Sequence, residues 1–213
     1  MLNLNKGEHK DLVFLNEPDL DVQITQQEGS SLRIVLVNSP DLKKGQKSED
    51  TLSALHTIEV HQVGVNCQTE IYVLAYLKNK ERVCTRTHVH HDVGEGVSKQ
   101  VVKYVLEDEA QGEFLGELKI LPDAQKVSAE QTNRNLLLSE KATMRTRPQL
   151  EIYADDVKAT HGATTGQLDD SALFYMQQRG IDPVTARQML VQAFMQDILN
   201  YLRISKKSCT FAQ

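Results

Sequence analysis

A long succession of short strand-like runs, separated by turns and with no helical stretch between them, is the feature that most constrains how this chain folds. Apolar and polar residues alternate with a period of two within several runs, as at Leu20, Val22 and Ile24. Many short strands without intervening helices are compatible with a sandwich, a barrel or a β-solenoid. Because no strict self-similarity at a fixed period is visible, the pattern alone does not choose among these three folds.

The chain changes character towards its C-terminus, and we expect a β core over residues 1–166 followed by a helical segment over 167–213. Within the core, the polar stretch 38–51 predicts a loop, and the Gly-Ala-Thr-Thr-Gly sequence of Gly162–Gly166 predicts a turn. The last residues, 205–213, are expected to fray.

Two helices are predicted in the C-terminal segment. Asp170 is expected to cap a helix that ends at Arg179, and Gly180 suits the left-handed residue that stops it. Asp182 followed by Pro183 is typical of a second helix N-terminus. Apolar residues then recur at helical spacing, namely Leu190, Val191, Phe194, Ile198, Tyr201 and Leu202. Such a stripe usually packs, which favours a cap on the open end of the β domain over a docking surface.

Composition argues against several classes of protein. The net charge is −5, from 24 basic and 29 acidic residues, whereas a nucleic-acid binder usually has a basic surplus. Aromatic residues make up 5% of the chain and Trp is absent, so a base-stacking platform is not expected. No apolar run is long enough to span a bilayer, and the first residues lack the apolar core of a signal peptide. Three widely spaced cysteines (Cys67, Cys84 and Cys209) are typical of a reducing compartment, so we expect a cytoplasmic protein.

The stretch from Cys84 to His91 is the clearest metal-site candidate that the residues alone offer. On a strand, Cys84, His88 and His90 share one face, and His91 points to the other. Cys84 and His88 are then about 13 Å apart, too far to hold one ion. His88 and His90 are about 7 Å apart and could share an ion with help from a neighbouring strand. Because no C-x-x-C or H-E-x-x-H spacing is present, a polar face with three solvated histidines is the favoured interpretation.

His161 is a lone histidine that shares a strand face with Val157 and Ala159. A lone histidine is more often hydrogen-bonded structure than a ligand, but neutral imidazole can ligate iron when a second chain supplies thiolates.

Glu151, Asp155 and Asp156 could act as paired carboxylates in acid–base catalysis. Adjacent aspartates before a β run are, however, more typical of a turn. The chain has no nucleophile elbow, no phosphate-binding loop and no dinucleotide fingerprint.

Five separated segments carry a resemblance to a known family: Leu121–Lys126, Gln131–Leu138, Pro148–Val157, His161–Asp169 and Leu173–Ile181. Through them the chain resembles the SufB/SufD family, which are scaffold proteins of the Suf iron–sulfur cluster assembly system. The His-Gly pair at 161 and 162 is similar to the SufD branch, because the SufB branch tends to carry His-Glu there. The match is dense from about Arg86 to Leu202 and weak before it.

The resemblance implies a mainly β fold, a right-handed parallel β-helix (β-solenoid) core whose end the helical segment would cap. It also implies a non-enzymatic, SufD-like scaffold subunit. Such a subunit pairs with a SufB-like paralogue through the β-helices and docks a SufC-like ABC-type ATPase through its C-terminal helices. Whether the chain also forms a homodimer in isolation is left open, and neither nucleic acid nor a membrane is an expected partner.

The resemblance further implies the site residues. His161 matches a candidate ligand of a transient iron–sulfur cluster at the subunit interface, in trans with a cysteine of the partner. No cluster is expected to be bound stably by this chain alone. The segment 168–202 is implied as the ATPase-docking surface, with plausible contacts at Phe174, Tyr175, Arg179 and Phe194.

Two departures from the family pattern are visible. Ala159 stands where many SufD relatives have cysteine. The sequence is also shorter than the family norm, and we expect either a compact variant without the N-terminal helical region or a truncated chain. One alternative is therefore a purely structural β-helix that positions the ATPase without ligating the cluster. Another is a carbohydrate-active β-helix enzyme, but it would need clustered carboxylates, and Asp155 and Asp156 alternate faces.

Overall fold

The computed structural model describes residues 1–39 and 53–208, with side chains as far as Leu202. Most of the loop predicted over 38–51 and the end of the predicted frayed tail lie outside the described residues; residues 205–208 are helical. The described residues form twelve strands followed by two helices: β1 (Leu2–Leu4), β2 (His9–Leu15), β3 (Asp19–Gln26), β4 (Ser31–Asn38), β5 (Ser53–Gln62), β6 (Gln68–Leu77), β7 (Arg82–His91), β8 (Val97–Leu106), β9 (Gln111–Ile120), β10 (Ser128–Leu137), β11 (Thr143–Ile152), β12 (Lys158–Gly166), α1 (Asp170–Gln178) and α2 (Pro183–Ser208).

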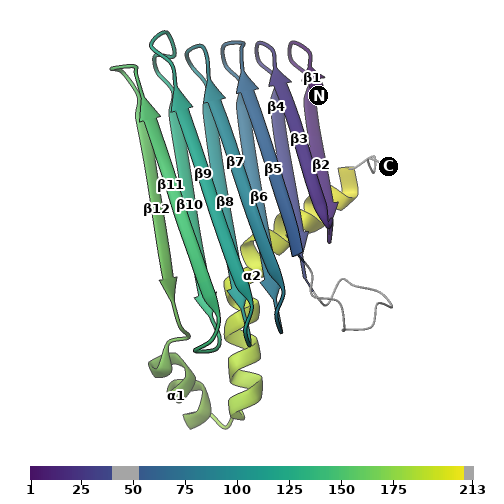
Figure 1. Ribbon diagram of the computed structural model, residues 1–213, viewed down its shortest axis with the longest axis vertical. Helices are drawn as coiled ribbons and strands as arrows, with labels where there is room; N and C mark the ends of the chain where they lie inside the picture. The colour runs from purple at the N-terminus through teal and green to yellow at the C-terminus, as the bar shows by residue number, and fades with distance from the viewer. Residues whose placement is uncertain (40–52, 209–213) are drawn as a thin grey trace.

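The strands pair in parallel and build two six-stranded sheets, in the orders β1-β3-β5-β7-β9-β11 and β12-β10-β8-β6-β4-β2 (Figure 1). Successive strands therefore alternate between the sheets, and each strand lies beside the one two before it. Ser53 pairs with Arg82 and Arg82 pairs with Gln111, so one turn of the parallel coil of strands takes 29 residues here. The expected parallel β-helix is confirmed.

The main core lies between the two sheets. It is filled by every second side chain of each strand, because alternate residues point inwards. In β7, Val83, Thr85, Thr87, Val89 and His91 are buried, and the residues between them face outwards. Each inner side chain stacks on the equivalent positions of the neighbouring turns, about 4.8 Å away. One cluster of buried residues runs through these layers and includes Ile34, Ile58, Ile71, Val102 and Phe114.

The turns between strands share the same backbone conformation at equivalent positions, although the residue types there differ. Asn79 and Asp108, which follow β6 and β8, are left-handed with φ of 56° and 58°. The backbone N–H of Asn79 donates to Oδ2 of Asp108 at 3.0 Å, so successive turns stack on one another. The turns after β5, β7 and β9 place left-handed φ values on Asn66, Glu95 and Lys126. Because different residues fill equivalent positions, the sequence letters conceal the repeat.

Helix α2 lies across the outer face of the second sheet and contacts β2, β4 and β6 (Figure 1). The apolar stripe of α2 packs on outward-facing residues of β4 and β6, and these two strands therefore carry apolar residues on both faces. The buried cluster consists of Val35, Val37, Tyr72, Leu74, Ile198 and Leu202. The rings of Tyr72 and Tyr201 stack with centroids 3.8 Å apart. The expectation of a cap on the open end was therefore wrong for α2, because its stripe matches a lateral face of the sheet. No helix among the described residues is long and apolar enough to cross a bilayer.

A buried lysine ties α2 to the sheet. Lys103, on the outer face of β8, has a side chain that is only 6% exposed. Its ammonium donates to both carboxylate oxygens of Asp197 at 2.8 and 2.7 Å, and to the carbonyl oxygen of Phe194 at 2.7 Å. It also lies 4.8 Å from the centre of the Phe194 ring. This satisfied cation fixes the position of the helix along the sheet, which apolar contacts alone specify less sharply.

Two local predictions were wrong. The Gly162–Gly166 stretch is not a turn, because it pairs with Thr132–Leu136 of β10 as part of β12. The cap of α1 is Asp169 rather than Asp170: its Oδ1 accepts from the backbone N–H of Ser171 at 2.9 Å. The second cap was correct, since Asp182 Oδ1 accepts from the N–H groups of Val184 and Thr185.

Replacing Asp197 by Ala tests the attachment of α2. We expect the free energy of unfolding to fall by about 1–3 kcal/mol, because the buried Lys103 ammonium loses its carboxylate. Urea unfolding followed by circular dichroism measures this, with Glu140→Ala, an exposed carboxylate in the β10–β11 connection, as the control. Equal stabilities of the two variants would show that the ion pair does not hold the helix.

Candidate functional site

The last turn of the coil, β11 and β12, leaves its inner face uncovered. Among the described strands β11 pairs only with β9 and β12 only with β10, so both sheets end here (Figure 1). His161, Ala163 and Thr165 of β12 are in register with Gln131, Asn133 and Asn135 of β10, which are buried inner-face residues. All three β12 residues are nevertheless exposed. The inner layer of the β-helix therefore continues into a row of side chains that no described residue covers.

Polar side chains occupy equivalent inner positions on β8, β10 and β12 of the second sheet, and His161 is the last of this row. Its register partners are Gln131 of β10 and, one strand further in, Gln100 of β8. Gln131 Nε2 donates to Gln100 Oε1 at 3.3 Å, and Thr87 Oγ1 donates to the same oxygen at 2.7 Å. Among the described residues, Gln131 Oε1 and Gln100 Nε2 have no hydrogen-bond partner. The interior thus becomes polar towards the uncovered end. Ala159 lies on the same inner face and brings no thiol.

The residues implied as ATPase contacts fall into two groups. Phe174 and Tyr175 of α1 are 62% and 58% exposed, and α1 has no buried residue. The Arg179 guanidinium lies 4.8 Å from the centre of the Tyr175 ring. Phe194 of α2 instead packs between the helix and the sheet, beside Val105, Leu136 and Val191. The exposed aromatic surface therefore lies on α1 and not on the middle of α2.

The histidines of β7 divide between the two faces of the strand. His91 points inwards, is fully buried, and its Nε2 lies 2.8 Å from Ser98 Oγ. Burial lowers the pKa of His91 to about 4, so the ring is neutral at pH 7. The prediction of three solvated histidines was wrong here, because the alternation of the strand turns one ring into the core. His88 and His90 face outwards as predicted.

Neighbouring strands place further imidazole and carboxylate groups beside His88 and His90, as a shared metal ion would need. Glu117 of β9 forms a group with both rings, and His61 and Glu59 of β5 form a second group with His90. Burial, and next the nearby His61, lower the pKa of His90. A 29-residue spacing in the sequence could have indicated this group, because Glu59, His88 and Glu117 are register partners separated by 29 residues each.

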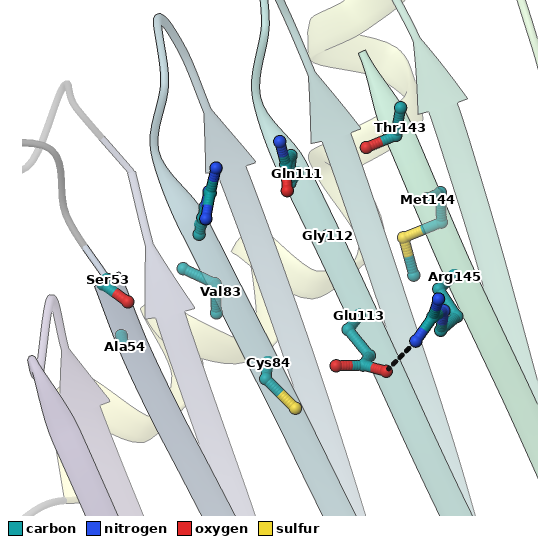
Figure 2. Close-up of a pocket in the computed structure, with 11 residues that line it drawn as sticks. Ser53, Ala54, Val83, Cys84, Gln111, Gly112, Glu113, Thr143, Met144 and Arg145 are labelled. Carbon is teal, nitrogen blue, oxygen red and sulfur yellow. Dashed lines mark ion pairs between the residues drawn. The ribbon is translucent and has the colours of Figure 1, made fainter.

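Cys84 lies apart from these histidines, as its distance along the strand predicted. It lines an open hollow of about 450 Å³ near the beginnings of β5, β7, β9 and β11 (Figure 2). An ion pair of 3.6 Å between Arg145 and Glu113 crosses this hollow. Burial, and next the Glu113 carboxylate, raise the pKa of the Cys84 thiol, so it is not an activated nucleophile. Cys84 and Cys67 are free cysteines.

The three acidic residues considered for acid–base catalysis lie on β11 and in the bend that follows it. Glu151 lies on β11, and its carboxylate is 3.8 Å from the Lys119 ammonium. Asp155 and Asp156 lie in the bend between β11 and β12, where the backbone N–H of Asp156 donates to Gln125 Oε1 at 2.9 Å. The turn interpretation of these aspartates is confirmed.

Comparison with known proteins identifies the family. A family model described as "SUF system FeS cluster assembly, SufBD core domain" matches residues 47–194 of the 213. The iron–sulfur cluster assembly protein SufD of Escherichia coli (strain K12) is 40% identical over 149 residues, 70% of this chain and 35% of that protein. SufD of Bacillus subtilis (strain 168) is 33% identical over 156 residues, 73% of this chain and 35% of that protein.

A third relative comes from a plant. The Arabidopsis thaliana protein named ABCI7, chloroplastic, is 34% identical over 145 residues, 68% of this chain and 30% of that protein. The chain thus spans about a third of the length of these three relatives. The match to the family model covers β5 to β12, which includes the last turn of the β-helix, and most of the helical segment. The chain belongs to the SufB/SufD family of iron–sulfur cluster assembly proteins and is SufD-like.

Proposed function

We propose that this chain is a non-enzymatic SufD-like scaffold subunit of an iron–sulfur cluster assembly complex. A SufB-like subunit covers the open end of its β-helix, and a SufC-like ATPase docks on its C-terminal helices. The observation that carries the proposal is the uncovered inner face of β12, with His161 in line with the buried Gln131.

The open end suits a second β-helix better than a partner of another shape. The outer edges of β11 and β12 present parallel-strand backbone groups, which another parallel strand pairs in register. An uncovered sheet edge favours uncontrolled association, so covering it also protects the subunit. The inner row His161, Ala163 and Thr165 then becomes buried at a joint between two stacked coils. A SufB-like paralogue offers matching strand spacing.

Burial at such a joint gives His161 a chemical role. A neutral imidazole ligates iron through one ring nitrogen, and thiolates from the partner complete the coordination. The cluster is cargo that leaves after assembly, so a site shared between two chains can release it when the chains move apart. Ala159 contributes no sulfur, which leaves the thiolates to the partner. In the purely structural alternative, His161 only packs in the joint.

The docking surface for the ATPase is α1 and the beginning of α2. Besides Phe174 and Tyr175, Val184 and Met189 are 65% and 47% exposed. Exposed apolar and aromatic side chains together with the cationic Arg179 are a composition common at the centres of protein interfaces. Lys103 fixes α2 to the sheet at Phe194 and Asp197, so an ATPase bound to these helices is also linked to the β-helix.

The change Ala163→Glu tests the joint. It places a carboxylate on the inner face of the last turn, where it is solvated in the free subunit and buried without a partner in the pair. Copurification with the SufB-like subunit should fall at least tenfold, with the unfolding midpoint unchanged. Thr164→Glu, one residue along and on the outer face, is the matched control. If Ala163→Glu leaves pairing intact, the open end is not the interface.

His161→Ala tests the ligand role inside the assembled complex. Complex formation and folding should match the unmodified protein, because the side chain is exposed in the free subunit. The iron and sulfide recovered per complex after anaerobic assembly should drop several-fold. Thr160→Ala serves as the control on the same strand. A full cluster yield from the His161 variant would favour the structural alternative.

Phe174→Ala combined with Tyr175→Ala tests the docking surface. Loss of two exposed rings should weaken binding of the SufC-like ATPase at least tenfold without lowering the thermal stability of the free subunit. Light scattering after size exclusion measures the complex. The pair Gln177→Ala and Gln178→Ala, on the same helix, is the control. Unchanged binding would place the ATPase elsewhere.

A further inference from the structure

A compact group of imidazole and carboxylate side chains lies on the outer face of the first sheet, on the opposite sheet from His161. Strands β5, β7 and β9 are adjacent and in register there. One row across the strands is Glu59, His88 and Glu117, and the next is His61, His90 and Lys119. Because side chains two apart share a face and strands lie about 4.8 Å apart, the rows form a tight grid.

The Glu117 carboxylate meets both β7 histidines. Its Oε2 lies 3.6 Å from Nδ1 of His88, and its Oε1 lies 3.5 Å from Nε2 of His90. Both distances exceed a normal N–H···O hydrogen bond. Donor atoms around a tetrahedral ion with bonds of about 2.0–2.1 Å stand roughly 3.3 Å apart. The donor atoms of His88, His90 and Glu117, which lie within 4.8 Å of one another, therefore have room for an ion between them.

The surroundings hold His90 in this position. The His61 ring packs against it, with centroids 4.5 Å apart. His61 is itself held by Glu59, with Nε2 3.0 Å from Oε1, and by Asp92, with Nδ1 3.7 Å from Oδ2. The nearby Lys119 ammonium lies 3.8 Å from the Glu151 carboxylate. The side chain of His90 is only 18% exposed, so its ring has little freedom to leave the group.

We propose that His88, His90 and Glu117 bind one divalent transition-metal ion, and that His61 and Glu59 position the His90 ring. Two imidazoles and one carboxylate suit zinc, iron(II), cobalt(II) and nickel(II), and do not suit magnesium or calcium. Three protein ligands leave at least one coordination position open to water or to a ligand atom from another molecule. This site is separate from the cluster interface, and its existence does not depend on the proposed function.

Equilibrium dialysis of the full chain against zinc tests the site, with cobalt(II) absorption as a second readout of coordination. Cys84→Ser and Cys209→Ser are present throughout, so that these thiols do not compete. We expect one ion per chain, and at least tenfold weaker binding in His88→Ala, His90→Ala and Glu117→Gln. Thermal unfolding confirms that each variant is folded, and Glu117→Gln keeps the side-chain shape.

Matched controls separate this site from its neighbours. His9→Ala, a histidine of β2 on the other sheet, and His161→Ala should bind zinc as the parent does. Glu59→Gln, which loosens the contact that positions His61 and through it His90, should weaken zinc binding less than Glu117→Gln does. Absence of zinc uptake by the parent, or uptake that survives His90→Ala, overturns the proposal. A large loss in Glu59→Gln with no loss in Glu117→Gln overturns the ligand assignment.

Discussion

The hydrogen bonding and stacking between successive turns of the coil is the interaction on which the rest of this structure depends. No strand buries its inner residues or satisfies its backbone alone, because both need a neighbouring strand in register. Register also fixes the outer faces, where a 29-residue spacing brings Glu59, His88 and Glu117 into one row. The same dependence makes the last turn incomplete, and its uncovered inner face is the basis of the proposed pairing.

The sequence predicted much of this fold, but the residues alone did not choose a solenoid. Alternation indicated the strands, and the helices were indicated by an acidic residue near each helix start, by Pro183 and by the stop at Gly180. The repeat was hidden because equivalent turn positions hold Asn66, Glu95 and Lys126 with the same left-handed conformation. The strand at Gly162–Gly166 was missed because small residues signal a turn when propensity is read locally, whereas β10 supplies the pairing that makes it a strand.

The candidate sites show a similar limit. The outward faces of His88 and His90 followed from the period of the strand, but their partners Glu117 and His61 required the register between strands. The position of α2 was also not predictable from its own stripe. An apolar stripe indicates packing without naming the surface, and the matching surface is formed by Val35, Val37, Tyr72 and Leu74, from strands far away in the chain.

Hydrogen–deuterium exchange of the chain, alone and mixed with a SufB-like subunit, tests whether the last turn of the β-helix is the pairing surface. We expect the backbone amides on the free edges of Thr143–Ile152 and Lys158–Gly166 to exchange quickly in the free chain and to become protected in the mixture. The amides of β1 and β2, at the other end of the coil, should be unchanged. Protection at β1 and β2 with none at β11 and β12 would show that the SufB-like subunit pairs with the other end of the β-helix.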